Sequence, residues 1–194
     1  MNEEYIKLQV EGSDWSYGSA WGDQMEEAIT NWFAKDIPKD ARILDIGCGE
    51  GRGLDALKKQ GFDSVFGVDI ALEKIKKARE NGHHIFNVDF HLLDTQESVK
   101  KFFDYTFCSH TLEHSYDIIR ALKSIEYVTK KALYFIVPVG ETKEEVEKYN
   151  PSHTFPFKDL QQIEHLLINH SYNDYILFEQ KRMCKEVWGI INYE

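Results

Sequence analysis

Cysteine is scarce in this sequence, and long apolar runs are missing. The 194 residues include three cysteines, Cys48, Cys108 and Cys184, and no C-x-x-C pair. An odd number of cysteines without that spacing predicts reduced thiols instead of a disulfide framework. No apolar run approaches the roughly 18 residues of a membrane span, and the first residues lack the basic and apolar regions of a signal peptide. We therefore expect a cytoplasmic protein without membrane association.

Positive charge is also in short supply. Lys and Arg total 23 against 33 Asp and Glu, so the net charge is −10. The basic residues form short pairs at the ends of helical patterns, where a cation interacts favourably with the helix dipole. These pairs include Lys58-Lys59, Lys76-Lys77 and Lys130-Lys131. Because nucleic-acid binding depends on neutralising phosphates with Lys and Arg, a nucleic-acid partner is disfavoured.

The sequence is organised around a glycine-rich stretch from Arg42 to Gly53. Its first part, Ile43 to Ile46, has the length and composition of a buried parallel strand. Glycines then stand at alternate positions, which permits a sharp turn and the close approach of a ligand to the backbone. A helix pattern with Leu54 and Leu57 follows, and Gly61 is a plausible C-cap. Strand, glycine turn and helix form the nucleotide-binding unit of doubly wound α/β folds.

The glycine spacing argues against the dinucleotide fingerprint G-x-G-x-x-G. Counted from Gly47, the third glycine would fall on Arg52, and counted from Gly49 it would fall on Leu54. The stretch reads Asp45-x-Gly47-x-Gly49-x-Gly51, and in this it resembles motif I of the class I S-adenosylmethionine (SAM)-dependent methyltransferases. An NAD-type oxidoreductase is therefore the less favoured alternative.

The resemblance covers most of the chain, from about residue 40 to the C-terminus. It includes the segment Leu112-Glu113-His114, which is similar to the type 11 and type 12 methyltransferase subgroup. It implies a Rossmann-like, doubly wound sheet of seven strands, mostly parallel with an antiparallel last strand. It also implies a single domain over residues 1–194. Within that domain, residues 1–38 form an N-terminal segment and helix, 39–139 the SAM-binding core, and 140–194 an acceptor-side loop, helix and terminal hairpin.

The periodicity of the chain supports this arrangement. Residues 1–17 show no clear period, and for the aromatic residues Trp15, Tyr17 and Trp21 packing on the core is favoured over a place in the ligand pocket. Strands are expected at 64–69, at 85–89 with a continuation to 94, at 103–108 and at 132–139. Helices are expected at about 25–33, 54–59, 72–79, 118–128 and 158–169, with a solvated helix within 141–148. A terminal hairpin is expected from 172–180 and 187–193.

The candidate SAM-binding residues follow from these positions. Asp69 ends the second strand 20 residues beyond Gly49, the spacing at which a carboxylate accepts hydrogen bonds from both ribose hydroxyls. The family pattern implies that Asp89 accepts a hydrogen bond from the adenine amino group and that the backbone of Phe90 contacts the ring, with Asp94 as the competing acceptor. The remaining residues that the resemblance implies are Asp45, Gly47, Cys48, Gly51, Ile70 and Ser109.

The catalytic candidates are three histidines, because histidine titrates near neutrality. His110 and His114 follow the fourth strand with Glu113, and His153 lies on the loop after the fifth, so all could reach one crevice. The spacing H-x-x-E-H also matches a zinc peptidase signature, but here it begins at a strand end. Relatives with Glu-x-x-Glu-His bind metal, so His110, Glu113, His114 and His153 form an alternative ligand set. A purely structural role is also open, and no metal is predicted.

The motifs favour SAM-dependent methyl transfer to a small-molecule acceptor, with S-adenosylhomocysteine as the product. The acceptor itself is not specified, because acceptor pockets in the resembled family are built from variable loops. A non-catalytic module that binds SAM or a partner with the same fold is the alternative from another class.

Overall fold

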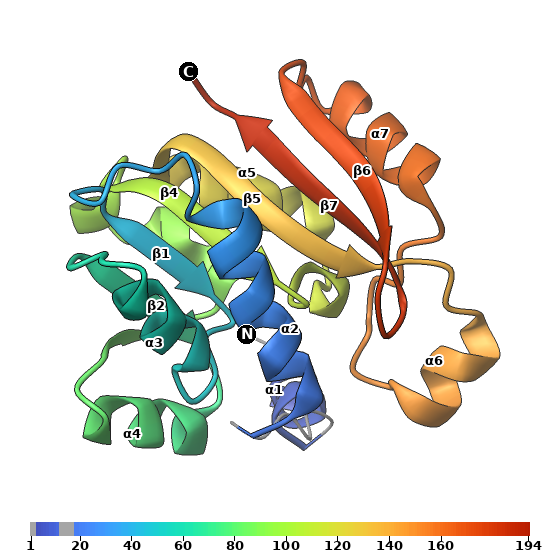
Figure 1. Ribbon diagram of the computed structural model, residues 1–194. Helices are drawn as coiled ribbons and strands as arrows, with labels where there is room; N and C mark the ends of the chain where they lie inside the picture. The colour runs from blue at the N-terminus through green and yellow to red at the C-terminus, as the bar shows by residue number, and fades with distance from the viewer. Residues whose placement is uncertain (1–2, 12–17) are drawn as a thin grey trace.

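The sheet is built outward from the strand that precedes the glycine turn. Its strands are β1 (Ile43–Ile46), β2 (Val65–Asp69), β3 (His84–Asn87), β4 (Phe103–Ser109), β5 (Thr129–Pro138), β6 (Tyr175–Lys181) and β7 (Lys185–Asn192). In the computed structural model, which describes residues 3–11 and 18–194, their order is β3-β2-β1-β4-β5-β7-β6 (Figure 1). The first five strands are parallel, and β7 runs antiparallel to both β5 and β6. The predicted fold class is confirmed.

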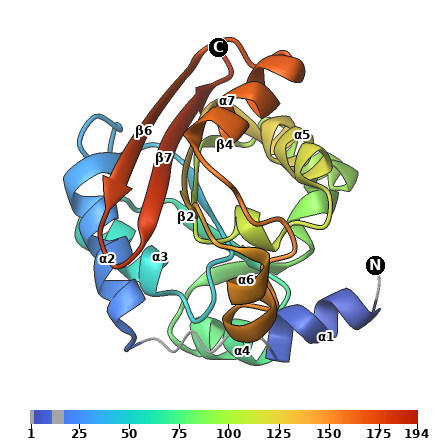
Figure 2. The ribbon, with the colours of Figure 1, turned by 90° about the vertical axis from the view of Figure 1, so that its right-hand side faces the viewer.

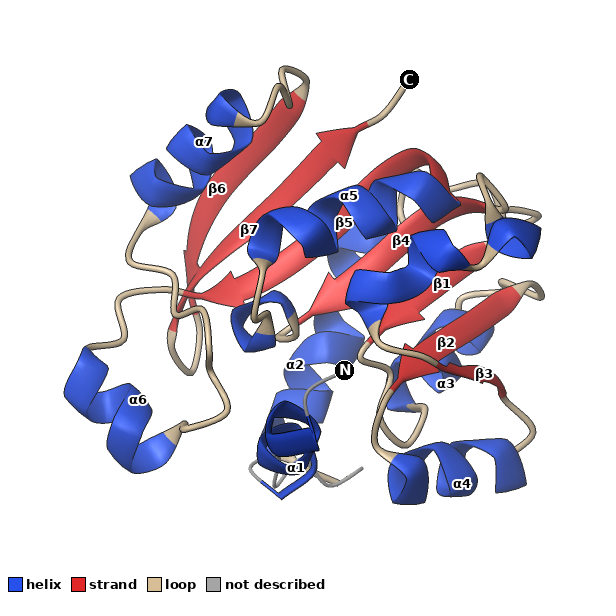
Figure 3. Ribbon diagram, turned by 180° about the vertical axis from the view of Figure 1, so that it is seen from behind, coloured by secondary structure: helices blue, strands red, loops and turns tan. Residues whose placement is uncertain are grey.

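Helices cover both faces of the sheet. They are α1 (Glu3–Glu11), α2 (Ala20–Ala28), α3 (Arg52–Lys59), α4 (Leu72–Glu80), α5 (Ile118–Val128), α6 (Lys143–Tyr149) and α7 (Leu160–Asn169). One apolar core lies under α2, α3 and α4, on the face seen in Figure 1. A second core lies under α5 and α7, on the face seen in Figure 3. All four residues of β1 are buried between these cores, which explains why three of them are large and apolar.

Three segments differ from the expectations. Residues 3–11 form a helix, α1, where no period was expected. α2 begins at Ala20, about five residues before the expected helix, and continues through a π-helical turn over Ile29–Phe33. The expected continuation of the third strand to residue 94 is wrong, because β3 ends at Asn87 and a 3₁₀ helix follows over Phe90–Thr95. Trp15 and Tyr17 lie outside the described residues.

Hydrogen bonds of Asp89 and His91 explain why a 3₁₀ helix forms where the strand was expected to continue. The Asp89 carboxylate accepts a hydrogen bond from the His91 backbone N–H at 3.0 Å and thereby caps the turn. The His91 side chain is fully buried, so its ring needs internal hydrogen-bond partners that an extended strand would not supply. Among the residues that the structure describes, none of the helices has the length and apolar character needed to cross a bilayer.

Candidate functional site

A cavity with about 1030 Å³ of empty space, part of which is open solvent, lies at the carboxyl ends of β1, β2 and β4. This is the edge of a parallel α/β sheet at which ligands bind. Its walls come from the glycine turn, from the segments that follow β2, β3 and β4, and from α1 and α2. Of the predicted cofactor residues, those that line it are Gly47, Cys48, Gly49, Asp69, Ile70, Phe90 and Ser109.

The glycine turn has the shape of a ligand cradle. Gly47, Gly49 and Gly51 all have positive φ angles, of 73°, 53° and 94°, a conformation that glycine adopts without steric cost. A Cβ atom on Gly47 would lie 2.2 Å from the Thr111 hydroxyl oxygen, so a larger residue cannot fit there. A Cβ atom on Gly49 would instead meet open cavity, with nothing closer than the Lys74 side chain at 4.0 Å. The space beside Gly49 therefore fits a ligand that lies against the backbone.

Gly51 has a different role from the one predicted. It does not line the cavity, and a Cβ atom there would lie 2.6 Å from the His83 ring. Its left-handed backbone starts α3 instead, with the backbone N–H of Asp55 donating to the Gly51 carbonyl at 3.0 Å. Gly51 thus shapes the turn from behind, and direct contact with a cofactor stays a prediction.

Asp69 joins the two loops that face the cavity. One carboxylate oxygen, Oδ2, accepts from the Gly49 backbone N–H at 2.8 Å, and the other, Oδ1, accepts from the Ala71 N–H at 2.8 Å. Each carboxylate oxygen can accept a second hydrogen bond, and the half-buried side chain lines the cavity. Asp69 is therefore held in place with acceptor capacity left for a hydroxyl-bearing ligand such as a ribose.

Asp45 lies beneath the turn and does not line the cavity. Its side chain is 2 % exposed and packs under the first turn of α3, where only a glycine at position 53 leaves room for it. Its Oδ2 atom has no hydrogen-bond partner among the described residues. Burial, and secondarily the negative charge of Asp69, raise the pKa of Asp45 to about 8. Asp45 is consequently protonated at neutral pH in the ligand-free protein.

The predicted adenine contact, Asp89, is turned away from the cavity. Val88 and Phe90 line the wall on either side of it, while Asp89 is 1 % exposed. Its Oδ1 accepts from the His91 ring at 2.6 Å, and its Oδ2 accepts from the Tyr116 hydroxyl at 3.2 Å. Burial opposes ionisation, but the hydrogen bonds from His91 outweigh it and hold the pKa of Asp89 below its ordinary value. Contact with adenine stays a prediction for this carboxylate.

Asp94, the competing acceptor, is also placed elsewhere. Its carboxylate lies 2.6 Å from the Arg120 guanidinium at the start of α5. The other nitrogen of the His91 ring lies 2.7 Å from the Ser115 hydroxyl oxygen. The network of Asp89, His91 and Ser115 therefore ties the segment after β3 to the segment after β4, and this places Val88 and Phe90 at the cavity wall.

Two of the three candidate histidines line the far end of the cavity. His110 has a φ of 50°, and its ring centroid lies 5.1 Å from that of Trp21. Its Nε2 lies 3.2 Å from the Glu186 carboxylate, and its Nδ1 lies 3.6 Å from that of Glu113. His114 lies one 3₁₀ turn further along, and burial lowers its pKa to about 4. At neutral pH its ring is therefore uncharged.

His153 does not line the cavity. It stands beside His114, with the ring centroids 4.9 Å apart and the planes nearly perpendicular. Its Nδ1 lies 2.6 Å from the Glu141 carboxylate, whereas the His114 Nδ1 lies 2.9 Å from the Ser152 carbonyl oxygen. Glu113 is 1 % exposed beside them, and burial raises its pKa well above the usual range. The three histidines were expected to reach one crevice, but only His110 and His114 line the cavity.

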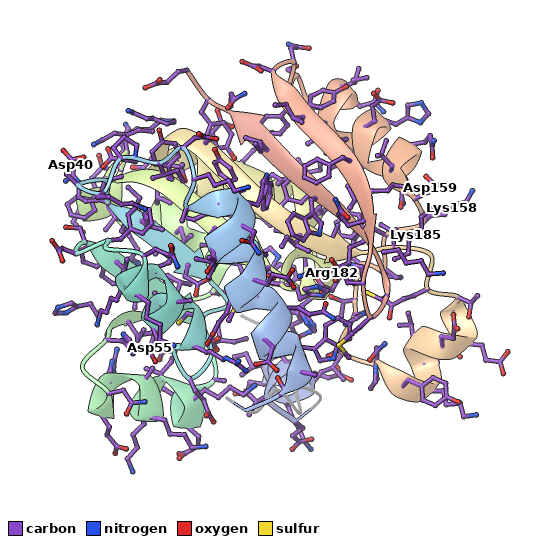
Figure 4. The ribbon with its side chains drawn as sticks, viewed as in Figure 1. Asp40, Asp55, Lys158, Asp159, Arg182 and Lys185 are labelled. Carbon is purple, nitrogen blue, oxygen red and sulfur yellow. The ribbon has the colours of Figure 1, made fainter. Side chains whose placement is uncertain are left out.

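Sequence reasoning missed the residues that hold His110. Glu186 at the start of β7 is fully buried and accepts hydrogen bonds from Arg182 and Trp188, each at 2.9 Å. Although burial raises its pKa, the hydrogen bonds from His110 and Trp188 keep the pKa of Glu186 below its ordinary value. Arg182 also donates to the backbone oxygen of Gln24 at 2.7 Å, and Figure 4 shows it between the terminal hairpin and α2. No local sequence signal marks these contacts.

Sequence reasoning also missed α1, the helix beside the cavity. Tyr5 and Gln9, one turn apart on α1, both line the cavity. The Tyr5 hydroxyl donates to the His114 backbone oxygen at 2.8 Å, and the Gln9 amide donates to the Ser152 oxygen at 2.9 Å. In Figure 2, α1 lies at the same end of the molecule as α4 and α6. The spacing of Tyr5 and Gln9 on one helix face was the signal available in the sequence.

Arg52, where a dinucleotide-binding turn could carry its third glycine, anchors α2 to α3. Its Nε donates to the Glu26 carboxylate at 2.9 Å, and one terminal nitrogen donates to the Ser19 backbone oxygen at 2.9 Å. It also pairs with Asp23. A Cβ atom on Gly22 would lie 2.1 Å from the Arg52 guanidinium, so a glycine is required where the two helices cross. These contacts place Ser19 and Gly22 in the cavity wall.

The sequence and the fold were compared with those of known proteins. Residues 37–182 match the family profile described as "Methyltransferase domain". The fold is similar to that of a SAM-dependent methyltransferase from Archaeoglobus fulgidus, with a TM-score of 0.67, 16 % identity, and coverage of 98 % of this chain and 100 % of that one. It is also similar to Haemonchus contortus phosphoethanolamine N-methyltransferase 2 in complex with SAM, with a TM-score of 0.69, 16 % identity, and coverage of 97 % and 55 %.

Two curated relatives differ in their named activities. The mouse protein "Arginine-hydroxylase NDUFAF5, mitochondrial" is 30 % identical over 190 residues, which cover 89 % of this chain and 50 % of that protein. The ubiquinone biosynthesis O-methyltransferase of Xylella fastidiosa is 35 % identical over 89 residues, which cover 43 % and 36 %. The chain spans half or less of the length of these relatives.

Proposed function

The chain belongs to the family of methyltransferase domains, whose cofactor is SAM, and from this premise we propose that it transfers the methyl group of SAM to a small-molecule acceptor. The observation that carries the proposal is the cavity at the carboxyl edge of the sheet. One end has a glycine cradle and a carboxylate with spare acceptor capacity, and the other has two histidines. We also infer membership of the subgroup that carries Leu112-Glu113-His114.

Five residues that line the cofactor end have a proposed role. The backbone of Gly47 and Gly49 lies along the methionine part, and the Asp69 carboxylate accepts from the ribose hydroxyls. Val88 and Phe90 pack against the adenine ring. Bound SAM supplies a methyl group that its sulfonium charge has already activated. The protein's task is then to hold the acceptor in line with that methyl group and, where necessary, to take its proton.

The acceptor end is proposed to use His110 as the proton acceptor. Glu186, at 3.2 Å from the ring, orients it in the way that a carboxylate orients a catalytic histidine. His114 is neutral at physiological pH, so it can accept a hydrogen bond without repelling a cationic cofactor. We propose that residues 140–194 and α1 together form this acceptor side.

Two observations favour a small acceptor. α1 contributes Tyr5 and Gln9 to the cavity wall and is fastened to the segments that carry His114 and Ser152. The net charge of −10 opposes binding of a phosphate backbone.

A second candidate activity is suggested by the mouse relative, which is named an arginine hydroxylase and aligns with 89 % of this chain. Hydroxylation replaces a C–H bond with C–O–H, taking one oxygen atom from O₂ and two electrons from a reductant. It would leave the methyl group of SAM untouched. The two activities are therefore distinguished by the product: a methyl group gained with release of S-adenosylhomocysteine, or an oxygen atom gained without it.

Calorimetric titration with SAM, S-adenosylhomocysteine and NAD tests the cofactor assignment. We expect the two adenosyl compounds to bind and NAD not to bind. Asp69→Ala should weaken SAM binding by about 10- to 150-fold, because a hydrogen bond to a charged group contributes about 1.5–3 kcal/mol. The exposed Asp63→Ala serves as the matched control. Unchanged affinity in Asp69→Ala would remove Asp69 from the site, and binding of NAD alone would overturn the assignment.

The acceptor is sought by incubating the protein and SAM with fractionated small-molecule extracts, using mass spectrometry to follow S-adenosylhomocysteine and mass gains. Release of S-adenosylhomocysteine with a methyl gain on a small molecule is the expected result. A gain of one oxygen atom on an arginine-containing peptide in the presence of O₂ and a reductant would favour the second candidate. Tight SAM binding without any turnover would favour the non-catalytic module.

A further inference from the structure

The strand β6 leaves one rim of the sheet unpaired. It is the last strand in the order, and within the described part of the chain only β7 pairs with it. Figure 2 shows β6 along its length, with no other segment drawn across it. An edge strand presents a row of backbone N–H and C=O groups that can pair with a further strand. β6 offers seven residues for such pairing, against four for β3 at the opposite rim.

Two hydrogen bonds of the β6–β7 hairpin show which backbone groups of β6 point outward. The Asn192 N–H donates to the Asp174 oxygen at 2.9 Å at one end, and the Arg182 N–H donates to the Cys184 oxygen at 3.0 Å at the other. Residues of antiparallel strands alternate between pairs that exchange hydrogen bonds and pairs that do not. The register is regular, so the even-numbered residues of β6 bond to β7 and the odd-numbered ones face away from it. These outward residues are Tyr175, Leu177, Glu179 and Lys181.

The outward residues of β6 are complementary to a second copy of themselves. When two β6 strands run antiparallel about a two-fold axis at Phe178, Leu177 lies opposite the second copy's Glu179. In the same register Tyr175 lies opposite the second copy's Lys181. Outward residues then face outward residues throughout, so each of their N–H and C=O groups finds a partner. Such a pair is closed, because both chains contribute the same strand.

The charges at the two ends of β6 fit the same arrangement. Asp174 precedes the strand and Lys181 ends it, and both side chains are exposed. The two-fold pair brings Asp174 of one copy next to Lys181 of the other at each end, where opposite charges on paired strands are favourable. Two chains of net charge −10 repel each other at long range, so attraction at the contact matters here. The Glu179 carboxylate lies 2.7 Å from the Lys185 ammonium of its own chain, which balances its charge.

Exposed apolar side chains also gather at this rim. Of the eight large apolar side chains that are exposed among the described residues, three lie on α7, on β6 and in the turn after β6, namely Ile168, Ile176 and Met183. Ile176 shares a face of the strand with Phe178, because side chains alternate along a strand. The Phe178 ring packs against Trp32 and Trp188, with centroids 5.8 and 5.9 Å away. At the two-fold axis the two Phe178 residues lie directly opposite each other, so this aromatic cluster continues from one chain into the next.

We propose that β6 joins two copies of this chain by antiparallel pairing about Phe178, so that their two seven-stranded sheets form one continuous sheet. The outward ladder, the charges at its ends and the exposed apolar side chains all fit the same occupant, a second copy. None of the described residues of β6 lines the cavity, so the pairing leaves the cavity accessible.

Sedimentation velocity of the full-length chain at a series of micromolar concentrations tests the proposal. We expect a reversible equilibrium between monomer and dimer. Glu179→Pro removes an outward N–H group and leaves the β6–β7 ladder complete, which an edge strand tolerates. Because a symmetric pair then loses two hydrogen bonds, the dissociation constant of the dimer should rise about 5- to 150-fold. Glu179→Ala is the matched control, since it removes the same side chain and its contact with Lys185 but keeps the N–H group. It should associate like the unaltered protein, and thermal melting of both variants verifies that they fold.

The end charges supply a second test that does not depend on proline. Asp174→Lys places like charges at both ends of the pair and should raise the dissociation constant about 2- to 30-fold. Combining Asp174→Lys with Lys181→Asp reverses both charges and should restore association.

A chain that stays monomeric at every concentration would overturn the proposal, as would a dimer that Glu179→Pro and Glu179→Ala affect equally. Failure of the double charge reversal to restore association would overturn this register of pairing. The charge variants decide the question if Glu179→Pro does not fold. SAM and acceptor are absent throughout, and the result is therefore independent of the proposed methyl transfer.

Discussion

The buried carboxyl group of Asp45 makes the pH dependence of stability a direct test of the site's electrostatics. Its pKa is about 8 in the folded protein against 3.8 for the unperturbed group. Between these two pH values the unfolded chain releases the proton while the folded protein keeps it. The folded state then binds more protons, so stability falls as the pH rises through this window. At about 1.36 kcal/mol for each pKa unit, the total loss is on the order of 5 kcal/mol.

Asp45→Asn removes this loss, because an amide cannot ionise and has nearly the same shape. The variant should match the unaltered protein near pH 4 and exceed its free energy of unfolding by several kcal/mol near pH 8. Urea unfolding at a series of pH values, without ligand, measures the difference. Comparing the two proteins cancels the opposite contributions of Asp89, Glu141 and Glu186, whose pKa values are lowered and whose stabilisation is lost as the pH falls.

Two controls sharpen this experiment. The exposed Asp63→Asn should leave the pH profile unchanged. Asp69→Asn should make the fall in stability smaller and end it at a lower pH, because the charge of Asp69 is the second cause of the raised pKa of Asp45 in the folded protein. A stability difference between Asp45→Asn and the unaltered protein that stays constant from pH 4 to pH 8 would refute the reasoning.

Two further predictions concern the cradle and α1. Gly49→Ala should cost only about 1–2 kcal/mol of stability, the usual cost of a left-handed residue with a Cβ, yet should sharply reduce SAM affinity because its Cβ enters the cavity. Gly47→Ala should abolish folding instead, since its Cβ would collide with Thr111. Calorimetric titration measures the SAM affinity of each variant, and thermal melting measures its stability. Equal effects of the two substitutions would contradict the different roles assigned to Gly47 and Gly49. Tyr5→Phe removes the hydrogen bond to His114 and should reduce the free energy that holds α1 against the protein by about 1 kcal/mol. The effect should be seen as faster amide hydrogen exchange in α1. Unchanged exchange would show that this bond does not hold the helix.

The sheet could be predicted because its signals are local. An apolar run followed by Gly47 and Gly49 identifies a strand and a tight turn, and Asp69 follows at a spacing fixed by one intervening helix. The number of strands and the antiparallel last strand were implied by the resemblance to the methyltransferase family, and the structure has both. Two of the three places that differ from the prediction, α1 and the segment after β3, are held by long-range polar contacts, such as the bond from Tyr5 to His114.

The acceptor side could not be predicted for the same reason. His110 and Glu186 are 76 residues apart, and His114 and Ser152 are 38 apart. Nothing in either segment indicates its partner, since a histidine on a loop reads the same whether it is exposed or held by a buried carboxylate. A catalytic role for the three histidines stays a prediction, and the finding that His110 and His114 line the cavity while His153 does not required the fold.

Asp45 and Glu113 share a property that packing does not explain. Both are buried carboxyl groups near the carboxyl edge of the sheet, and both have oxygens without hydrogen-bond partners among the residues that the structure describes. Burial raises the pKa of both groups, so folding at neutral pH carries the cost of protonating them, and an amide at either position would remove that cost because it cannot ionise. If the carboxyl groups serve only the fold, amides at 45 and 113 stabilise the protein and leave ligand binding intact. If they serve a cationic ligand, the same replacements stabilise the ligand-free protein and weaken its binding.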